Sequence, residues 1–101
     1  MRKPTFRLPK QVPVLGRPYV IKRVRMAEYG ACHFDLAEIH IRWGLKGDEL
    51  AETFLHELLH AILYESGADH RWSASTTESI VRALEHGLKR SLDLNHIVVR
   101  K

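Results

Sequence analysis

The chain has 101 residues, of which 45% are hydrophobic and 28% charged, and its formal net charge is +4. This length predicts one domain, and the balanced composition excludes a disordered or collagen-like chain. No apolar run approaches the roughly 20 residues that span a bilayer, so we expect no membrane contact. The single cysteine, Cys32, excludes an intramolecular disulfide and a cysteine-rich zinc knuckle, which favours a reducing, cytoplasmic setting. Histidine is the commonest metal ligand, so seven histidines in so short a chain suggest metal binding.

The N-terminal segment is basic and contains proline at regular intervals. All four prolines lie within residues 1–18, and no acidic residue occurs before residue 28. Proline fixes its own φ angle and biases the preceding residue toward extended backbone. We therefore predict that residues 1–18 form an arm with little regular structure. Its positive charge would allow weak contact with nucleic-acid phosphates.

Strands precede helices in the rest of the chain. β-branched and aromatic residues, and then alternation of apolar with polar residues, indicate short strands. After residue 47 the apolar residues recur every three or four positions, which is typical of helices with one buried face. The predicted elements are strands at 19–24, 31–34 and 37–42, helices at about 48–65 and 76–94, and a terminal extension at 97–99. Together they predict an α+β fold in which a small antiparallel sheet packs on two helices.

The segment His56-Glu57-Leu58-Leu59-His60 lies in the middle of the first predicted helix. Residues four apart share a helical face, so both imidazoles can bind one zinc ion. Glu57 is offset by one residue and can reach a water on the metal without being a ligand. Zinc lowers the pKa of such a water to about 7, and a carboxylate can then accept its proton. This is the HExxH arrangement of metallopeptidases, and its apolar flanks favour a metal that satisfies the buried polar groups.

A catalytic zinc site needs a third protein ligand, and four residues after the motif are candidates: Asp69, His70, Glu78 and His86. Glu78 begins the second predicted helix, and an antiparallel helix pair would bring it back toward the motif. A helix is also a more rigid platform for a ligand than a loop. Alternatively, Glu78 closes a capping box with Ser75. We favour Glu78 as the ligand, and the other three residues stay open as alternatives.

From Thr53 to Leu63, followed by a glycine and by Glu78 at the start of a helix, the sequence resembles the gluzincin group of zinc metallopeptidases. It is most similar to their minimal single-domain members and to small phage-type zincin proteins, over residues 19–94. The resemblance implies a single minimal zincin-like domain over residues 19–101. It also implies that Zn²⁺ is bound by His56, His60 and Glu78, with Glu57 as the general base. Larger gluzincins have a further downstream His or Tyr that stabilises the oxyanion, for which this sequence has no clear counterpart.

These observations predict a zinc-dependent metallopeptidase that hydrolyses peptide bonds through a zinc-activated water, with Glu57 as the base. We expect the strand at 37–42 to lie along the cleft and pair with an extended peptide or protein substrate. Three alternatives remain. The first is an SprT-like protein whose third ligand is His70 or His86. The second is a nucleic-acid-associated protein with a structural zinc site of four protein ligands. The third is a catalytically inactive adaptor with the zincin fold.

Overall fold

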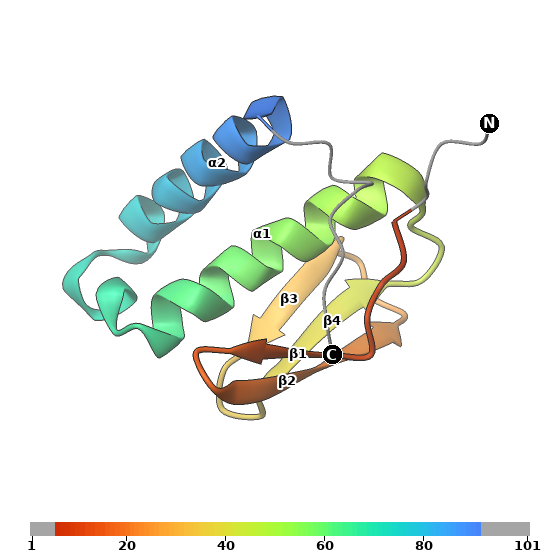
Figure 1. The fold of residues 1–101 in the computed structure, drawn as a ribbon, viewed down its shortest axis with the longest axis horizontal. Coiled ribbons are helices and arrows are strands. Elements are labelled where there is room, and N and C mark those ends of the chain that lie inside the picture. The colour runs from red at the N-terminus through yellow and green to blue at the C-terminus, as the bar shows by residue number, and fades with distance from the viewer. Residues whose placement is uncertain (1–5, 92–101) are drawn as a thin grey trace.

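The computed structural model describes residues 6–91, which form a four-stranded sheet and two α-helices in three layers (Figure 1). The sheet forms the first layer, α1 lies across one face of it, and α2 lies on the far side of α1. The elements are β1 (Gln11–Val14), β2 (Arg17–Val24), β3 (Gly30–His33), β4 (Glu38–Arg42), α1 (Gly47–Glu65), a 3₁₀ helix η1 (Ala68–Arg71) and α2 (Ala74–Ser91). The α+β class predicted from the sequence is confirmed.

The sheet is mixed, so the predicted antiparallel sheet is wrong. Its strand order is β1-β2-β4-β3. β1 pairs antiparallel with β2 and β3 pairs antiparallel with β4, but β2 and β4 run parallel, with Ile21 opposite Ile39. The prediction that the strand at 37–42 borders the cleft as an edge is also wrong, because β4 is an inner strand and β3 is the edge. The apolar–polar alternation of a strand specifies its two faces but not its neighbours.

Residues 11–18, predicted as part of an irregular arm, instead form the β1–β2 hairpin. Val14 pairs with Arg17 across a two-residue turn, in which Leu15 and Gly16 have φ angles of 49° and 88°. Two positive φ angles match the twist of a hairpin. Pro13 and Pro18 face each other one pair further along. That is a non-hydrogen-bonded pair, so neither strand loses a ladder bond to the missing proline N–H groups.

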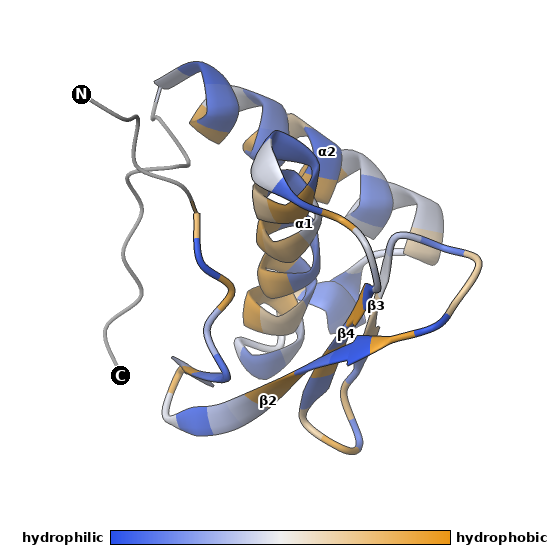
Figure 2. Cartoon of the chain, turned by 90° about the vertical axis from the view of Figure 1, so that its right-hand side faces the viewer, coloured by the Kyte–Doolittle hydropathy of each residue, from blue (hydrophilic) through white to orange (hydrophobic). Residues whose placement is uncertain are grey.

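The hydrophobic core lies between the sheet and α1. Tyr19, Ile39 and Ile41 are fully buried on the inner face of the sheet, and Phe54 of α1 is 3% exposed. Figure 2 shows the hydrophobic residues of α1 in orange, whereas most of α2 is hydrophilic. Phe6, which precedes β1, adds to this core, with its ring centroid 5.6 Å from that of Phe54. This packing fixes α1 against the sheet.

The second helix packs mainly against α1, and only Thr77 and Val81 of α2 are buried. Its N-terminus is capped by Ser73, whose Oγ accepts a hydrogen bond from the Thr76 N–H at 3.2 Å. The Ser75–Glu78 capping box considered above does not form, so the Glu78 side chain is available for other contacts. Neither α1 nor α2 is long and apolar enough to cross a membrane. The end of the second predicted helix and the extension at 97–99 lie outside the described residues, as do residues 1–5.

Candidate metal centre

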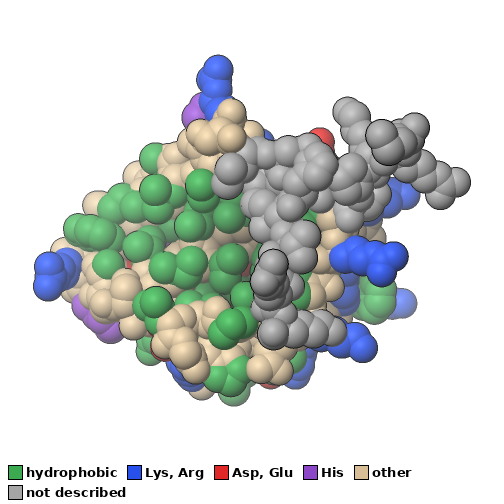
Figure 3. Space-filling model, viewed as in Figure 1, with side chains coloured by type: hydrophobic (Ala, Val, Ile, Leu, Met, Phe, Trp, Pro, Cys, Tyr) green, Lys and Arg blue, Asp and Glu red, His purple; other side chains and the backbone are tan. Residues whose placement is uncertain are grey.

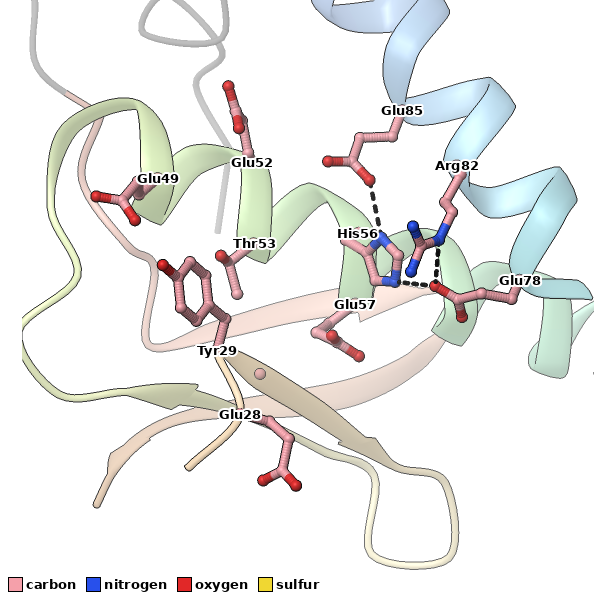
Figure 4. Close-up of a pocket in the computed structure, with 11 residues that line it drawn as sticks. Glu28, Tyr29, Glu49, Glu52, Thr53, His56, Glu57, Glu78, Arg82 and Glu85 are labelled. Carbon is pink, nitrogen blue, oxygen red and sulfur yellow. Dashed lines mark hydrogen bonds and ion pairs between the residues drawn. The ribbon is translucent and has the colours of Figure 1, made fainter. Parts of the chain in front are cut away.

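His56 lies on the side of α1 that faces α2 (Figure 4), and His60, one turn further along α1, also contacts Glu78 of α2. Their ring centroids are 5.1 Å apart, as expected for residues four apart on one helical face. The Nε2 atom of His56 lies 2.9 Å from one carboxylate oxygen of Glu78, and the Nε2 atom of His60 lies 2.9 Å from the other. The antiparallel packing of α1 and α2 thus brings together three residues that the sequence separates by up to 22 positions.

These three side chains suit a zinc ion. One ligand atom from each of His56, His60 and Glu78 can be chosen so that all lie within 4.8 Å of one another. Ligands bound tetrahedrally to zinc at about 2.0–2.1 Å lie about 3.3 Å from each other, so the 2.9 Å contacts need to open by only about 0.4 Å. Two imidazoles and one carboxylate, with room for a water, are also the donor set of many catalytic zinc sites.

Glu85, which the sequence analysis missed, holds the ring of His56 from the other side. Its Oε2 atom lies 2.8 Å from His56 Nδ1. A carboxylate only accepts hydrogen bonds, so His56 donates to it from Nδ1, and Nε2 is the ring atom that a metal would use. Metal-binding histidines are commonly oriented by such a carboxylate. The signal in the sequence is the spacing of seven between Glu78 and Glu85, which places both on one face of α2.

Glu78 lies at the centre of this network and is ionised. Burial alone would raise its pKa, but His56, His60 and Arg82 together hold the pKa of its carboxyl below the ordinary value. The guanidinium of Arg82 donates to Glu78 Oε1 at 3.3 Å, within one turn of α2. The site therefore places a charged carboxylate oxygen next to two imidazole nitrogens.

Glu57 lies beside the histidines without a partner of its own. Its exposed fraction is 9%, and no residue between 6 and 91 donates a hydrogen bond to it. Burial is the main cause that raises its pKa, to about 7; the charge of His56 opposes this shift, and Glu78 and Glu85 add to it. β3 passes close by because Gly30 has no side chain: a Cβ atom there would lie 3.0 Å from Glu57 Cγ and 2.9 Å from Thr53 Cγ2. Glu57 is thus a buried carboxyl group that can exchange a proton near neutral pH.

A cavity of about 470 Å³ opens beside this cluster, between α1, α2 and the start of β3 (Figure 4). Its lining includes His56, Glu57 and Glu78, and it also reaches Tyr29 and Arg82. Arg82, which contacts Glu78, can donate hydrogen bonds to an oxyanion, a role for which the sequence suggested no residue, although its spacing of four from Glu78 on α2 is visible in the sequence. Tyr29 reaches the cavity through the tertiary fold, and its hydroxyl points away from His56 (Figure 4).

The other predicted ligand candidates lie elsewhere. Asp69 and His70 belong to η1, where the His70 ring lies 5.8 Å from that of Tyr64, and His86 is exposed on α2. None of the three joins the cluster of possible metal ligands found among residues 6–91, and none lines the cavity.

Comparison with protein-family models, with curated proteins and with solved structures gives no match to this chain.

Proposed function

We propose that the protein is a zinc-dependent metallopeptidase of the gluzincin type, with Zn²⁺ bound by His56, His60 and Glu78. One observation carries the proposal. Glu78, from a different helix, contacts the Nε2 atoms of both histidines, while the nearby Glu57 is buried beside an open cavity and accepts no hydrogen bond from residues 6–91. When bound, zinc would polarise a substrate carbonyl and lower the pKa of a water.

The chain's own contribution to hydrolysis would come mainly from Glu57. Its carboxylate accepts a proton from the attacking water and delivers that proton to the leaving amine, so the group is regenerated in each turnover. Both roles need only that the Glu57 carboxylate lies next to the water and the leaving group, as its place beside His56 on α1 allows. Arg82, beside Glu78 in the same cavity, would donate a hydrogen bond to the developing oxyanion.

The substrate would bind as an extra strand on β3. β3 is an edge strand, antiparallel to β4, and Gly30 lets it run next to Glu57. An extended peptide that pairs with this free edge would present its backbone carbonyls to the cavity. This replaces the expectation that the strand at 37–42 performs the pairing, because the inner strand β4 has both of its edges occupied.

The number of protein ligands separates a catalytic from a structural zinc site. A structural site would need a fourth ligand, for which Asp69, His70 and His86 were the alternatives. Among residues 6–91 the candidate group contains three residues, which favours an open position for water and substrate over a closed site. The same observation argues against an SprT-like site whose third ligand is a histidine.

The test is a comparison of the wild type with Glu57→Gln on a mixture of unstructured peptides, with cleaved products detected by mass spectrometry. Glutamine keeps the size of the side chain but accepts no proton. We expect cleavage to fall by roughly 10²-fold or more while zinc content and the circular dichroism spectrum stay unchanged. Asp35→Asn, which neutralises an exposed carboxylate outside the cavity, is the matched control and should cleave like the wild type.

Two results would contradict the proposal. Equal cleavage by the wild type and by Glu57→Gln would show that another group performs the reaction. A zinc-loaded wild type that cleaves no peptide of the mixture would favour the adaptor or structural-zinc alternatives.

A further inference from the structure

The inner face of the sheet changes in chemical character where β2 and β4 end. In β2 the buried Ile21 is followed at alternate positions by Arg23 and, just past the strand, by Arg25. In β4 the buried Ile41 is followed in the same way by Trp43. Because β2 and β4 are parallel, both rows leave the core at the same end of the sheet. There the apolar face continues as arginine and tryptophan.

The contacts of the structure place these three residues together. The Trp43 N–H donates to the carbonyl of Val24 at 3.0 Å, and Val24 lies between the two arginines. The guanidinium of Arg23 lies 6.0 Å from the centre of the Trp43 ring, and its Nη1 donates to the Leu45 carbonyl at 2.9 Å. Arg25 and Trp43 line one open cavity of about 450 Å³. We call Arg23, Arg25 and Trp43 the sheet-end cluster.

The positive charge of the sheet-end cluster is not compensated by the described part of the protein. The neighbouring Lys22 is paired with Glu38 at 2.9 Å, but neither Arg23 nor Arg25 forms an ion pair with a carboxylate among residues 6–91. In Figure 3, which has the orientation of Figure 1, several Lys and Arg side chains lie on the right, beside the ends of β2 and β4. Trp43 is 61% exposed, although tryptophan is on average highly buried. The cluster therefore combines unpaired cations with an uncovered aromatic ring.

This combination suits single-stranded nucleic acid. Arginine binds phosphate, and every base has a face that can stack on tryptophan. The hydrogen bond to Leu45 uses one of the five N–H groups of Arg23, so others can donate to a phosphate. The cavity beside Trp43 offers room for a base. An anionic membrane would attract the same arginines, but proteins bind its surface through several apolar side chains that enter the lipid, and the cluster has one.

We propose that the sheet-end cluster binds single-stranded nucleic acid, with a base stacked on Trp43 and the adjoining phosphates held by Arg23 and Arg25. Binding should depend little on base sequence, because stacking and phosphate contacts do not read the edges of the bases. The cluster lies outside the cavity that contains the candidate metal ligands, so the inference is independent of the proposed peptidase function. It also differs from the contact expected of the N-terminal arm, since its residues follow β1.

The first experiment observes each tryptophan alone, because the chain has two. Trp72→Phe leaves Trp43 as the only tryptophan. Trp43→Phe leaves Trp72, which is 39% exposed and lies after η1, at the other end of α1. Each variant is titrated with a short oligothymidylate at low salt while the tryptophan emission is recorded. We expect a stacked base to quench Trp43 in the first variant, and the emission of Trp72 in the second to stay unchanged.

The second experiment measures affinity by the anisotropy of the same oligonucleotide, labelled with fluorescein. Trp43→Ala should weaken binding by about tenfold or more, and Trp43→Phe should restore most of it, because phenylalanine also stacks. Arg25→Gln should lower the slope of log affinity against log salt by about 0.7, the value for one phosphate contact on a single strand. Arg71→Gln, an equally exposed arginine on η1, is the matched control and should leave the slope unchanged.

Three results would overturn the inference. Emission of Trp43 that is not quenched, or equal quenching of Trp43 and Trp72, would show that no base stacks at the cluster. Binding with the same salt slope in Arg25→Gln as in the wild type would assign the phosphate contacts to the N-terminal arm. Tighter binding to phosphatidylglycerol vesicles than to the oligonucleotide would identify the cluster as a membrane-binding surface. These measurements involve neither zinc nor turnover, so they leave the proposed peptidase function untouched.

Discussion

The two sides of α1 form different kinds of interface. Toward the sheet, α1 contributes apolar side chains that are almost completely buried, among them Leu50, Ala51, Phe54 and Ala61. Toward α2 it contributes His56 and His60, which meet carboxylates rather than apolar groups. α2 in turn buries only Thr77 and Val81. One side of the helix resembles an ordinary core, whereas the other combines apolar burial at Val81 with charged and hydrogen-bonded groups around His56 and His60.

This difference indicates which interface maintains the fold and which one would bind a metal. Apolar burial is favourable whatever the ligand state. A layer of two imidazoles facing Glu57, Glu78 and Glu85 carries excess negative charge, which is costly away from water unless a cation compensates it. We therefore expect a metal ion to stabilise the α1–α2 interface and to leave the α1–sheet interface nearly unaffected.

The largest expected effect is a loss of stability when the interface between α1 and the sheet is disturbed. Phe54→Ala should lower the free energy of unfolding by about 3–5 kcal/mol, because it leaves a cavity between α1 and the sheet. Leu84→Ala on α2, where the side chain is 44% exposed, should cost about 1 kcal/mol or less. Urea unfolding followed by circular dichroism measures both. Similar losses in the two variants would show that α2 contributes as much to the fold as the sheet does.

The next largest expected effect is the stabilisation of the α1–α2 interface by zinc. Zinc at 100 times its dissociation constant should stabilise the protein by about 2.7 kcal/mol. Amide hydrogen exchange should slow more in α2 than in β2 or β4. The double variant His56→Ala, His60→Ala should lose the one zinc per chain that we expect in the wild type, as measured by elemental analysis.

The matched control is His33→Ala, His40→Ala. These two rings lie 4.2 Å apart on the sheet, outside the cavity. We expect this variant to retain the zinc. One zinc per chain in the His56, His60 double variant would refute the site, and equal protection of all elements by zinc would refute the distinction between the two interfaces.

Smaller changes in zinc affinity should distinguish the residues that would bind the metal from the residues that orient them. Glu85→Gln should weaken zinc binding by about 10- to 100-fold, because the neutral amide oxygen is a weaker acceptor for His56 Nδ1–H than the carboxylate that orients the ring. Glu78→Gln should weaken binding further, whereas His70→Ala and His86→Ala should have no effect. Competition with a chromogenic chelator measures all four affinities. If His70→Ala or His86→Ala removes the metal while Glu78→Gln retains it, the third ligand is a histidine and the SprT-like alternative gains.

The elements of the fold could be predicted better than their arrangement. The recurrence of apolar residues predicted a helix over about 48–65, and α1 spans Gly47–Glu65. The parallel pairing of β2 with β4 could not be inferred, because the sequence of a strand does not record which strand lies beside it. The β1–β2 hairpin was missed because Pro13 and Pro18 suggested irregular backbone, although opposite each other they disturb no ladder bond.

In the candidate site, too, relations between residues close in the sequence could be predicted better than contacts made by the tertiary fold. The spacing of four was enough to place His56 and His60 on one face, because that relation is local. Glu78 could be proposed only by assuming an antiparallel helix pair, which the structure contains. Glu28 and Glu49 reach the cavity through the sheet topology and through the position of α1, so nothing in their local sequence distinguishes them from other surface carboxylates.

The smallest effect concerns the sheet side of α1 at its last residue. The hydroxyl of Tyr19 donates to Glu65 Oε2 at 2.6 Å, and Arg17 donates to the same oxygen at 2.8 Å, so β2 anchors the end of α1. The hydrogen bond from Tyr19 is the main cause that holds the pKa of Glu65 below its ordinary value of 4.5; Arg17 adds to this shift, and partial burial opposes it. Because the unfolded chain takes up this proton at a higher pH than the folded one, the contribution to stability is complete above pH 4.5. It is lost as the pH falls through the lower pKa of the folded state.

Thermal unfolding between pH 3 and pH 7 should therefore be less pH-dependent in Glu65→Gln than in the wild type, and Asp35→Asn should behave like the wild type. The difference should be the same with and without zinc, since these contacts lie on the interface that the metal does not join. Parallel pH profiles for the wild type and Glu65→Gln would show that this anchor does not depend on the charge, and a zinc-dependent difference would show that the two sides of α1 are coupled.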